Sequence, residues 1–211
     1  MTASSQTVTP TYPGKAPGEF RNRDAFAAIK TDGSVVTWGI GNSGGDSSAV
    51  ADELNAEGTP AVTQVVSNRS AFAALREDGS VVTWGEGVYE PTSFGGYSSE
   101  VAYELDADGS PEVTKIFSTT SAFAALREDG SVVTWGDAEH GGNSDSVANQ
   151  IDADGSPEVT EIFSTALAFT ALREDGSIIT WGDNGYSGES DSFLDQIGEL
   201  DADDSPAVTE I

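Results

Sequence analysis

The 211-residue sequence contains no cysteine and few basic residues, and both absences narrow the classes of protein it can represent. Without cysteine, disulfide bridges, thiolate metal sites and a cysteine nucleophile are excluded. Only 9 Lys and Arg residues stand against 36 Asp and Glu, so the formal net charge is −27. Because so acidic a surface repels phosphate backbones and anionic lipids, we expect neither nucleic acid nor a membrane as partner.

The sequence also lacks a long apolar run. Residues 1–20 contain no apolar stretch that could form the core of a signal peptide, and no segment is apolar for long enough to span a bilayer. We therefore expect a soluble chain without membrane insertion, whose export would require another signal or a larger parent protein. A hydrophobic share of 37% is sufficient to bury the core of one compact domain.

No set of residues predicts catalysis. His140 is the only histidine, so neither a typical zinc site nor a histidine triad can be assembled, and we expect a solvated loop residue. The Arg-Glu-Asp triplets at 76–78, 127–129 and 173–175 fall at expected hairpin tips, where exposed charge is ordinary. Without a nucleophile, a base and an orienting group, we expect a protein that is not an enzyme.

Four segments of the chain repeat one another without gaps, and this repeat is the main feature of the sequence. They are residues 25–39 (AFAAIKTDGSVVTWG), 71–85 (AFAALREDGSVVTWG), 122–136 (AFAALREDGSVVTWG) and 168–182 (AFTALREDGSIITWG). Their tryptophans are separated by 46, 51 and 46 residues, a period typical of a propeller blade or a solenoid coil. Because a tryptophan recurs in every unit, we interpret all four as core residues: Trp38, Trp84, Trp135 and Trp181.

Each repeat predicts a tight β-hairpin. The segments on either side of Asp-Gly favour β-structure, and Asp-Gly is the strongest short signal for a hairpin turn. We place the turns at Gly33, Gly79, Gly130 and Gly176. The first strand of each hairpin is apolar on both faces, which predicts burial between stacked sheets that its alanines allow to approach closely.

Two further elements are expected between successive hairpins. A third strand is predicted over 61–67, 112–118 and 158–164, each introduced by a proline, which costs no ladder hydrogen bond at that position. The patterns SSAVADEL, SSEVAYEL, SDSVANQI and SDSFLDQI place a capping serine before apolar residues at helical spacing, which predicts one or two helical turns. The repeating unit is therefore three strands plus a short helix.

The two ends of the chain complement each other. The sequence stops at SPAVTEI, in mid-strand by comparison with SPEVTEIFST, while residues 20–25 align with residues 163–168. The C-terminal segment thus supplies the strand that the first repeat lacks, which is how a propeller ring closes without an open sheet edge. The same complementarity acting between molecules would build a filament.

We therefore predict an all-β fold, a four-bladed β-propeller closed by pairing of its N- and C-terminal strands. Residues 1–18 carry Thr, Ser, Pro and Gly without periodicity, which predicts a flexible arm. Residues 19–211 form the single propeller domain, with repeats near 19–58, 59–109, 110–155 and 156–211.

The core AALREDGSVVTWG resembles the repeat of the regulator of chromosome condensation family, where a strand ending in Ala-Leu meets an Asp-Gly turn and then a strand ending in Trp-Gly. It also looks like the repeats of large bacterial secreted or surface proteins. The resemblance implies a β-propeller, commonly of seven blades, in proteins that exchange nucleotides on chromatin or inhibit β-lactamase. Only four copies are present here, and Gly/Ser-rich loops replace the family's Gly-Gln-Leu-Gly segment, so we carry over the architecture and not those activities.

Three acidic turns are candidate calcium sites. Alternating carboxylates precede a bend in each, as in fragments of calcium-binding loops; they are Asp106, Asp108, Asp152, Asp154, Asp201 and Asp203. The complete ligand spacing is absent, and the first copy reads Asn-Ala-Glu-Gly-Thr over 55–59. Solvated Asp-Gly turns are the alternative interpretation, so we expect no cofactor unless it is calcium.

Aromatic residues that break the repeat are the candidate ligand-binding residues. They lie in the second and fourth connections: Tyr89, Phe94, Tyr97, Tyr103, Tyr186 and Phe193. Aromatic side chains in loops on a rigid scaffold are typical of a binding face. The alternative is that they cover the apolar edges of their own blades.

These observations favour a non-catalytic structural or adhesive repeat module, extracellular or surface-associated, that acts by assembly or binding. One alternative is a discrete propeller that binds a protein or glycan, as an inhibitor or a lectin does. Another is a subunit that forms filaments by strand complementation of its termini. The expected partners are accordingly a protein, a glycan or the chain itself.

Overall fold

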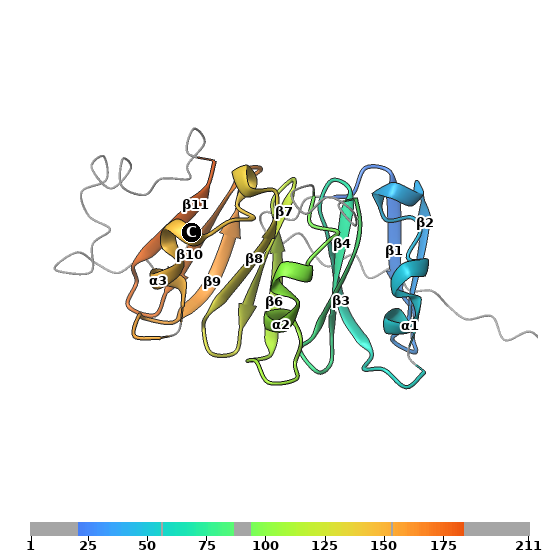
Figure 1. The fold of residues 1–211 in the computed structure, drawn as a ribbon, viewed down its shortest axis with the longest axis horizontal. Helices are drawn as coiled ribbons and strands as arrows, with labels where there is room; N and C mark the ends of the chain where they lie inside the picture. The colour runs from blue at the N-terminus through green and yellow to red at the C-terminus, as the bar shows by residue number, and fades with distance from the viewer. Residues whose placement is uncertain (1–20, 56, 87–93, 153, 184–211) are drawn as a thin grey trace, which may run out of the picture.

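The computed structural model of the chain describes residues 21–55, 57–86, 94–152 and 154–183. In this part of the chain, four antiparallel sheets stand side by side in a row along the longest axis (Figure 1). We number these sheets as blades in chain order. Blade 1 lies at one end of the row and blade 4 at the other. The fold is thus the four-bladed, all-β propeller architecture that the repeats predict.

Blade 1 contains two strands in the described residues, and each later blade contains three. Blade 1 consists of β1 (Ala25–Ile29) and β2 (Val35–Gly39). Blade 2 consists of β3 (Val62–Ser67), β4 (Ala71–Arg76) and β5 (Val81–Gly85). Blade 3 consists of β6 (Val113–Ser118), β7 (Ala122–Arg127) and β8 (Val132–Gly136). Blade 4 consists of β9 (Val159–Ser164), β10 (Ala168–Arg173) and β11 (Ile178–Gly182).

The predicted hairpins and third strands are confirmed. Every Asp-Gly turn joins two antiparallel strands in which a phenylalanine lies opposite the tryptophan, as Phe72 does opposite Trp84. The strands expected after the prolines begin one residue later than expected and pair with the first strand of each hairpin. They form the inner edge of blades 2, 3 and 4, whereas β1 has no third strand beside it within the described residues.

A short helical segment follows each of the first three hairpins, as predicted. A 3₁₀ turn leads directly into one α-helical turn: η2 (Ser48–Val50) and α1 (Ala51–Leu54), η3 (Ser99–Val101) and α2 (Ala102–Leu105), η5 (Asp145–Val147) and α3 (Ala148–Ile151). Further 3₁₀ turns, η1 (Gly41–Ser43) and η4 (Ala138–His140), lie in the loops before η2 and η5. The fourth pattern, SDSFLDQI, lies outside the described residues.

The predicted role of the capping serines is wrong. Ser47, Ser98 and Ser144 occupy the N-cap positions, but their side chains make no capping hydrogen bond. Each hydroxyl instead lies 2.9 to 3.0 Å from the hydroxyl of a strand threonine: Thr37, Thr83 or Thr134. The serine therefore fixes the helical segment to its own blade, because the threonine offers a nearby donor and acceptor on the sheet.

Each sheet has two different faces, and the core forms where one face of a blade packs on the other face of its neighbour. The Phe face carries the phenylalanine and tryptophan, as Phe72 and Trp84 do in blade 2, and the Ala face carries the alternate residues, as Ala71 and Ala73 do. The Phe face of each later blade packs on the Ala face of the blade before it, which forms three successive apolar clusters. Strands such as β4 are therefore buried on both faces, as predicted.

Each buried tryptophan is also tied to the preceding blade by a hydrogen bond. The indole N–H groups of Trp84, Trp135 and Trp181 donate to the carbonyl oxygens of Gly44, Gly95 and Gly141 at 3.0 to 3.1 Å. These glycines lie in the loop that follows the preceding hairpin. A buried indole N–H requires such a partner, so the loop of one blade completes the core of the next.

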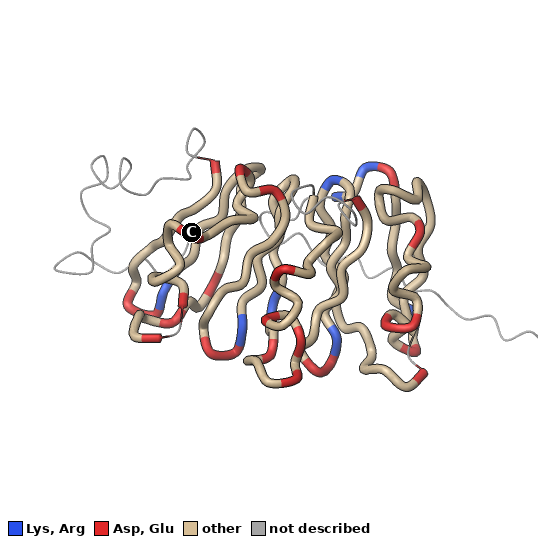
Figure 2. Tube along the Cα trace, in the orientation of Figure 1, with Lys and Arg blue, Asp and Glu red and all other residues tan. Residues whose placement is uncertain are grey.

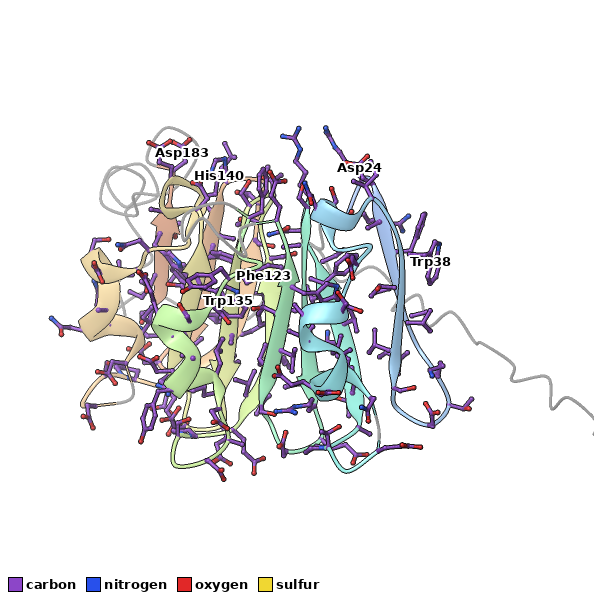
Figure 3. All side chains as sticks on the ribbon, turned by 45° about the vertical axis from the view of Figure 1, so that its right-hand side comes forward. Asp24, Trp38, Phe123, Trp135, His140 and Asp183 are labelled. Carbon is purple, nitrogen blue, oxygen red and sulfur yellow. The ribbon has the colours of Figure 1, made fainter. Side chains whose placement is uncertain are left out.

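Trp38 departs from the prediction that all four tryptophans are core residues. Its exposed fraction is 48%, against 2% for Trp84. Figure 3 shows Trp38 on the outer side of the end sheet, while Phe123 and Trp135 lie between sheets. The reason is positional, because no described blade precedes blade 1 and so none covers its Phe face.

Three predictions concern segments outside the described residues. They are the flexible arm over 1–18, the fourth short helix, and ring closure by the C-terminal strand. Within the described part of the chain, no helix has the length and apolar character needed to cross a membrane.

Candidate functional site

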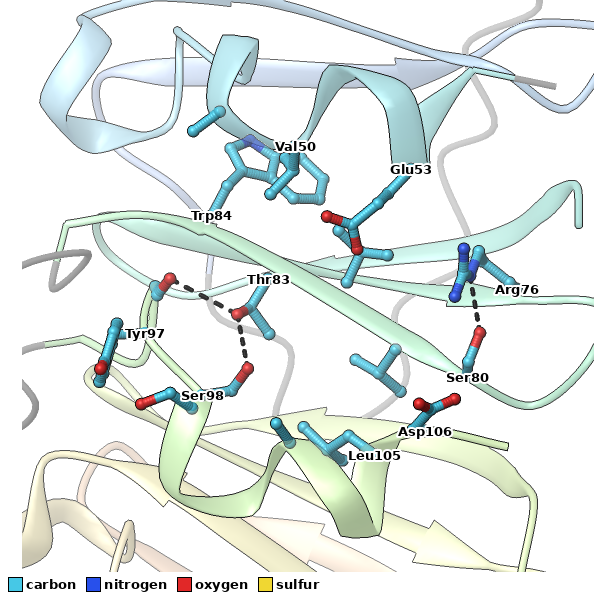
Figure 4. Close-up of a pocket in the computed structure, with 16 residues that line it drawn as sticks. Val50, Glu53, Arg76, Ser80, Thr83, Trp84, Tyr97, Ser98, Leu105 and Asp106 are labelled. Carbon is cyan, nitrogen blue, oxygen red and sulfur yellow. Dashed lines mark hydrogen bonds between the residues drawn. The ribbon is translucent and has the colours of Figure 1, made fainter. Parts of the chain in front are cut away.

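Two equivalent grooves run along the outer strands, between successive short helices. The first groove lies over β5 between α1 and α2 and encloses about 410 Å³ (Figure 4). The second groove lies over β8 between α2 and α3 and encloses about 460 Å³. Their linings match nearly position for position, because both are built from the same parts of consecutive repeats.

The floor of the first groove is apolar. Val82 and Trp84 of β5 are almost fully buried beneath it, and Val50 and Leu105 close its sides from the neighbouring helical segments. The second groove has Val133 of β8 as floor, with Val101 and Ile151 at the same side positions. An apolar floor with polar edges is the usual composition of a surface that binds a ligand.

The rims of both grooves carry mainly carboxylates. Glu53 and Asp106 stand at the edges of the first groove (Figure 4). The second groove is lined by Glu100, Glu104, Asp145 and Asp152. Figure 2 shows acidic residues along the helical segments and the adjacent loops, where they outnumber the basic ones.

One arginine lies at the base of each groove, and its side chain forms a hydrogen bond with a serine of the adjacent hairpin turn. The Nε–H of Arg76 donates to Ser80 Oγ at 2.6 Å, and Arg127 donates to Ser131 Oγ at 2.7 Å. Each serine hydroxyl in turn donates to the turn aspartate, Asp78 or Asp129. Arg173 and Ser177 repeat the same hydrogen bond in blade 4. The Arg-Glu-Asp triplets are therefore parts of the turn architecture.

These hydrogen bonds also set the ionisation of the turn aspartates. Burial opposes the charged form of Asp78, yet the hydroxyl and backbone N–H of Ser80, aided by the Arg76 guanidinium, lower its pKa below the ordinary value. The same causes lower the pKa of Asp129. Both carboxylates are thus ionised near neutral pH, and each offsets the charge of the arginine beside it.

Three of the six predicted ligand-binding aromatics lie in the described residues, and they take different places in the fold. Tyr97 lines the first groove, where its equivalent in the second groove is Asn143. Tyr103 is 69% exposed on α2, and Ser110 Oγ donates to its carbonyl oxygen at 3.0 Å. Tyr89, Tyr186 and Phe193 lie outside the described residues.

Phe94 belongs to the core between blades 2 and 3. It packs against the apolar cluster there with a φ of 55°, and its carbonyl oxygen accepts a hydrogen bond from Asn68 Nδ2. The guanidinium of Arg69 lies 5.9 Å from the ring centroid of Phe94. For this residue, the interpretation as cover for the edge of its own blade fits the structure.

The acidic turns that suggest calcium are held by their own backbone. Asp106 Oδ1 accepts from the N–H of Asp108 at 3.3 Å, and Asp152 Oδ1 accepts from the N–H of Asp154 at 3.2 Å. In the described ranges, no three carboxylate or imidazole side chains come together in a group that could hold a metal ion. Asp201 and Asp203 fall outside these ranges. Calcium binding stays a prediction, which a calorimetric titration with calcium chloride tests.

His140 is half-buried and has a partner. Its Nδ1 lies 2.7 Å from Asp137 Oδ1, and its carbonyl oxygen accepts from Thr119 Oγ1 at 2.9 Å. The expected solvated loop residue is therefore a fixed part of the loop that carries Gly141.

The grooves could not be found from one repeat alone, because each one combines residues of two consecutive repeats. Glu53, Arg76 and Asp106 stand far apart in sequence and meet only when the blades stack. The sequence does carry one signal for the position of the helical segments, namely the threonine and serine whose hydroxyls contact each other. They recur in each of the first three repeats, but are 10 residues apart in two of these repeats and 15 in the other.

Solved structures with a similar fold include two of yeast RCC1 and one of a human protein. Yeast RCC1 (Prp20) bound to Kap60 is 19% identical, with a TM-score of 0.50 over 90% of this chain and 47% of its own. Prp20p of Saccharomyces cerevisiae, solved in work on its binding to Gsp1p and histones, is 16% identical, with a TM-score of 0.50 over 86% of this chain and 46% of its own. Human WBSCR16 is 18% identical, with a TM-score of 0.49 over 78% of this chain and 46% of its own.

The chain therefore spans about half the length of each of these three solved proteins. No protein-family model matches the sequence, and no curated protein matches it either. At these identities the likeness shows the fold alone, and it agrees with the resemblance of the AALREDGSVVTWG repeat. The chain has the fold of an RCC1-like propeller.

Proposed function

We propose that this chain is a non-catalytic binding module that holds a basic protein segment in the grooves along its outer strands. The observation that carries the proposal is the pair of equivalent grooves, each with an apolar floor and a carboxylate rim. The aliphatic stems of lysine and arginine suit such a floor, while their charged ends suit such a rim. The net charge of −27 further attracts a basic partner from a distance.

The fold comparisons support a protein as the class of partner. One similar solved protein is described by its binding to Gsp1p and histones, which is a statement about that protein. The basic character of the partner is inferred here from the charge of the grooves. A location outside the cell or at its surface is part of the proposal, and it is supported by the likeness of the repeats to those of large bacterial surface proteins.

Binding of a (Lys-Leu)₅ peptide, which alternates basic and apolar side chains, tests the proposal. The double variant Glu53→Gln with Asp106→Asn removes two charges from the first groove. The matched control, Asp24→Asn with Glu139→Gln, removes two charges from sites outside both grooves. We expect the groove variant to weaken binding in the first groove about tenfold, since two exposed ion pairs of about 0.7 kcal/mol each sum to about 1.4 kcal/mol. The second groove should keep its affinity, and the control should change the affinity of either groove less than twofold. Equal weakening by both variants would mean attraction to the general surface charge and would refute the groove.

Self-assembly is the second candidate function. It is favoured by the apolar Phe face of blade 1, which the described residues leave open.

A further inference from the structure

The outer strand of each blade has one edge that pairs with no other strand in the described residues. In blade 3, the strand order β6-β7-β8 ends at β8, which pairs with β7 alone. The second groove runs along this outer edge, because it is lined by the consecutive residues Val132, Val133 and Thr134. Successive side chains of a strand point to opposite faces of its sheet, so a groove that is lined by three in a row follows the edge.

The hydrogen bonds of the hairpin show which backbone groups of β8 face this groove. The N–H of Arg127 donates to the carbonyl oxygen of Ser131 at 2.9 Å, and bonded and non-bonded pairs alternate along an antiparallel ladder. Val133 therefore bonds to β7, whereas the N–H and C=O groups of Val132 and Thr134 point away from it. The connection from β8 to α3 lies wholly in the described part of the chain, within which these four groups have no hydrogen-bond partner.

Blade 2 repeats this arrangement at the first groove. The lining of that groove includes Val81, Val82 and Thr83 in succession. The same alternation applies, since the hairpin turn closes with the equivalent hydrogen bond at 3.0 Å, and it directs the backbone groups of Val81 and Thr83 outward. Figure 4 shows β5 between the helical segments that carry Val50 and Leu105.

The two helical segments flank the edge of β5 on opposite faces of its sheet. Val50 packs in the apolar cluster on the Phe face, with Trp84, and Leu105 packs in the cluster on the Ala face, with Ala73. An added strand would continue the sheet between the two segments, with its side chains pointing alternately toward one and the other. The open positions are valine and threonine in both blades, whereas proteins usually protect such an edge with charged residues or proline.

The open part of each edge is short. Beyond Thr134 the following loop closes over the strand, since a Cβ atom on Gly142 would lie 2.5 Å from the carbonyl oxygen of Gly136. The N–H and C=O groups of Val132 and Thr134 can therefore pair with an extended segment of three residues, whose first and third residues each exchange two hydrogen bonds with the edge.

We propose that the basic segment binds as an added strand on the outer edge of β5 or β8, with backbone hydrogen bonds to Val81 and Thr83 or to Val132 and Thr134. This binding mode rests on the proposed function, because it specifies how the basic segment is held. The backbone bonds provide affinity for an extended segment of any sequence, and the carboxylate rims select a basic one. A second copy of this chain is disfavoured as the added strand, because both copies carry a net charge of −27.

Amide hydrogen exchange of the full chain, followed residue by residue by nuclear magnetic resonance, tests the proposal with (Lys-Leu)₅ as the probe. Without peptide, the amides of Val132 and Thr134 should exchange faster than that of Val133, which bonds to β7. With free peptide at ten times its Kd, exchange at Val132 and Thr134 should slow about tenfold. Val35, the equivalent outward position of β2, lies outside both grooves and should keep its rate. Bound peptide that leaves the rates of Val132 and Thr134 unchanged would overturn the proposal.

Val132→Pro blocks the edge of β8 from the protein side. Proline removes an outward N–H and no ladder hydrogen bond, which is why edge strands tolerate it. The variant should lose the peptide-induced protection at Thr134 and keep that at Thr83, which reports on the first groove of the same molecule. Val35→Pro is the matched control and should keep both, and the far-ultraviolet circular dichroism of the two variants should match that of the original chain. Protection at Thr134 that survives in folded Val132→Pro would also overturn the proposal.

The two proposals fail in different ways. If the peptide does not bind, both are refuted. If it binds and Glu53→Gln with Asp106→Asn weakens it, while the outward amides keep their exchange rates, the grooves hold the segment by its side chains alone. That result would refute the added strand and leave the proposed function standing.

Discussion

Substitution of Gly44 by alanine tests the central packing rule of the fold, in which the loop of one blade closes on the Phe face of the next. Gly44 is buried with a φ of +94°, and its carbonyl oxygen accepts the indole N–H of Trp84. A Cβ atom at this position would lie 2.5 Å from Phe72 Cδ2 and 2.7 Å from Cε2. The ring of Phe72 is itself packed in the core and has no room to move away.

Two costs add in Gly44→Ala. The left-handed backbone costs an alanine about 1 to 2 kcal/mol. Overpacking against the Phe72 ring costs a further 1 to 3 kcal/mol, roughly. Gly58→Ala is the matched control, because its φ is +87° but no atom lies within 4 Å of the added Cβ. The control should therefore show the backbone cost alone.

Urea unfolding followed by tryptophan fluorescence measures both variants against the original chain. We expect a loss of about 3 kcal/mol in the free energy of unfolding for Gly44→Ala and about 1.5 kcal/mol for Gly58→Ala. The melting temperatures should fall by about 10 °C and about 5 °C, respectively. Equal losses would show that Phe72 moves aside at no cost, and would refute the close packing of loop on ring.

The hairpin turns give two further predictions. Ser131→Ala should cost about 1 to 3 kcal/mol in urea unfolding, because it leaves the Arg127 Nε–H and the Asp129 carboxylate without their buried hydroxyl partner, whereas exposed Ser146→Ala should cost almost nothing. Folding lowers the pKa values of Asp78 and Asp129. Their ionised carboxylates therefore contribute fully to stability at a pH above the pKa of an unfolded aspartate, about 3.9, and this contribution is lost as the pH falls through the lower pKa of the folded protein. Thermal melts between pH 2 and pH 6 should show this loss, and Ser131→Ala should reduce it; a stability independent of pH in that window would contradict the role given to these carboxylates.

The regular part of the fold was predictable from sequence because its signals are local. Asp-Gly between β-favouring segments predicts a hairpin, and the glycines at the turns, such as Gly79 with a φ of +78°, adopt the backbone conformation that the turn requires. The apolar pattern of AFAAL likewise predicts burial on both faces. These features need no knowledge of neighbouring blades.

Features that depend on packing between neighbouring blades were predicted less well from the sequence. Trp38 has the same local sequence as Trp84 but a different exposure, because burial is decided by the blade that precedes each one. Ser98 has the sequence of a helix cap, but Thr83 lies within hydrogen-bonding distance only once the sheet has formed. The grooves follow the same logic, since Tyr97 becomes part of a concave surface only when α1 and α2 take their places on either side of β5.

The hydrogen bonds from the tryptophan indoles to the glycine carbonyls all run the same way along the row of blades, from one blade to the blade before it. Trp84, Trp135 and Trp181 each depend on a loop nearer the N-terminus, and in the described residues no blade relies in this way on the one that follows it. Loss of the first unit would therefore leave Phe72 and Trp84 in the situation of Phe26 and Trp38. Gene duplication or deletion of a whole unit consequently changes the length of the row without creating a new kind of terminus, so the number of units can drift in evolution while the rules of packing stay the same.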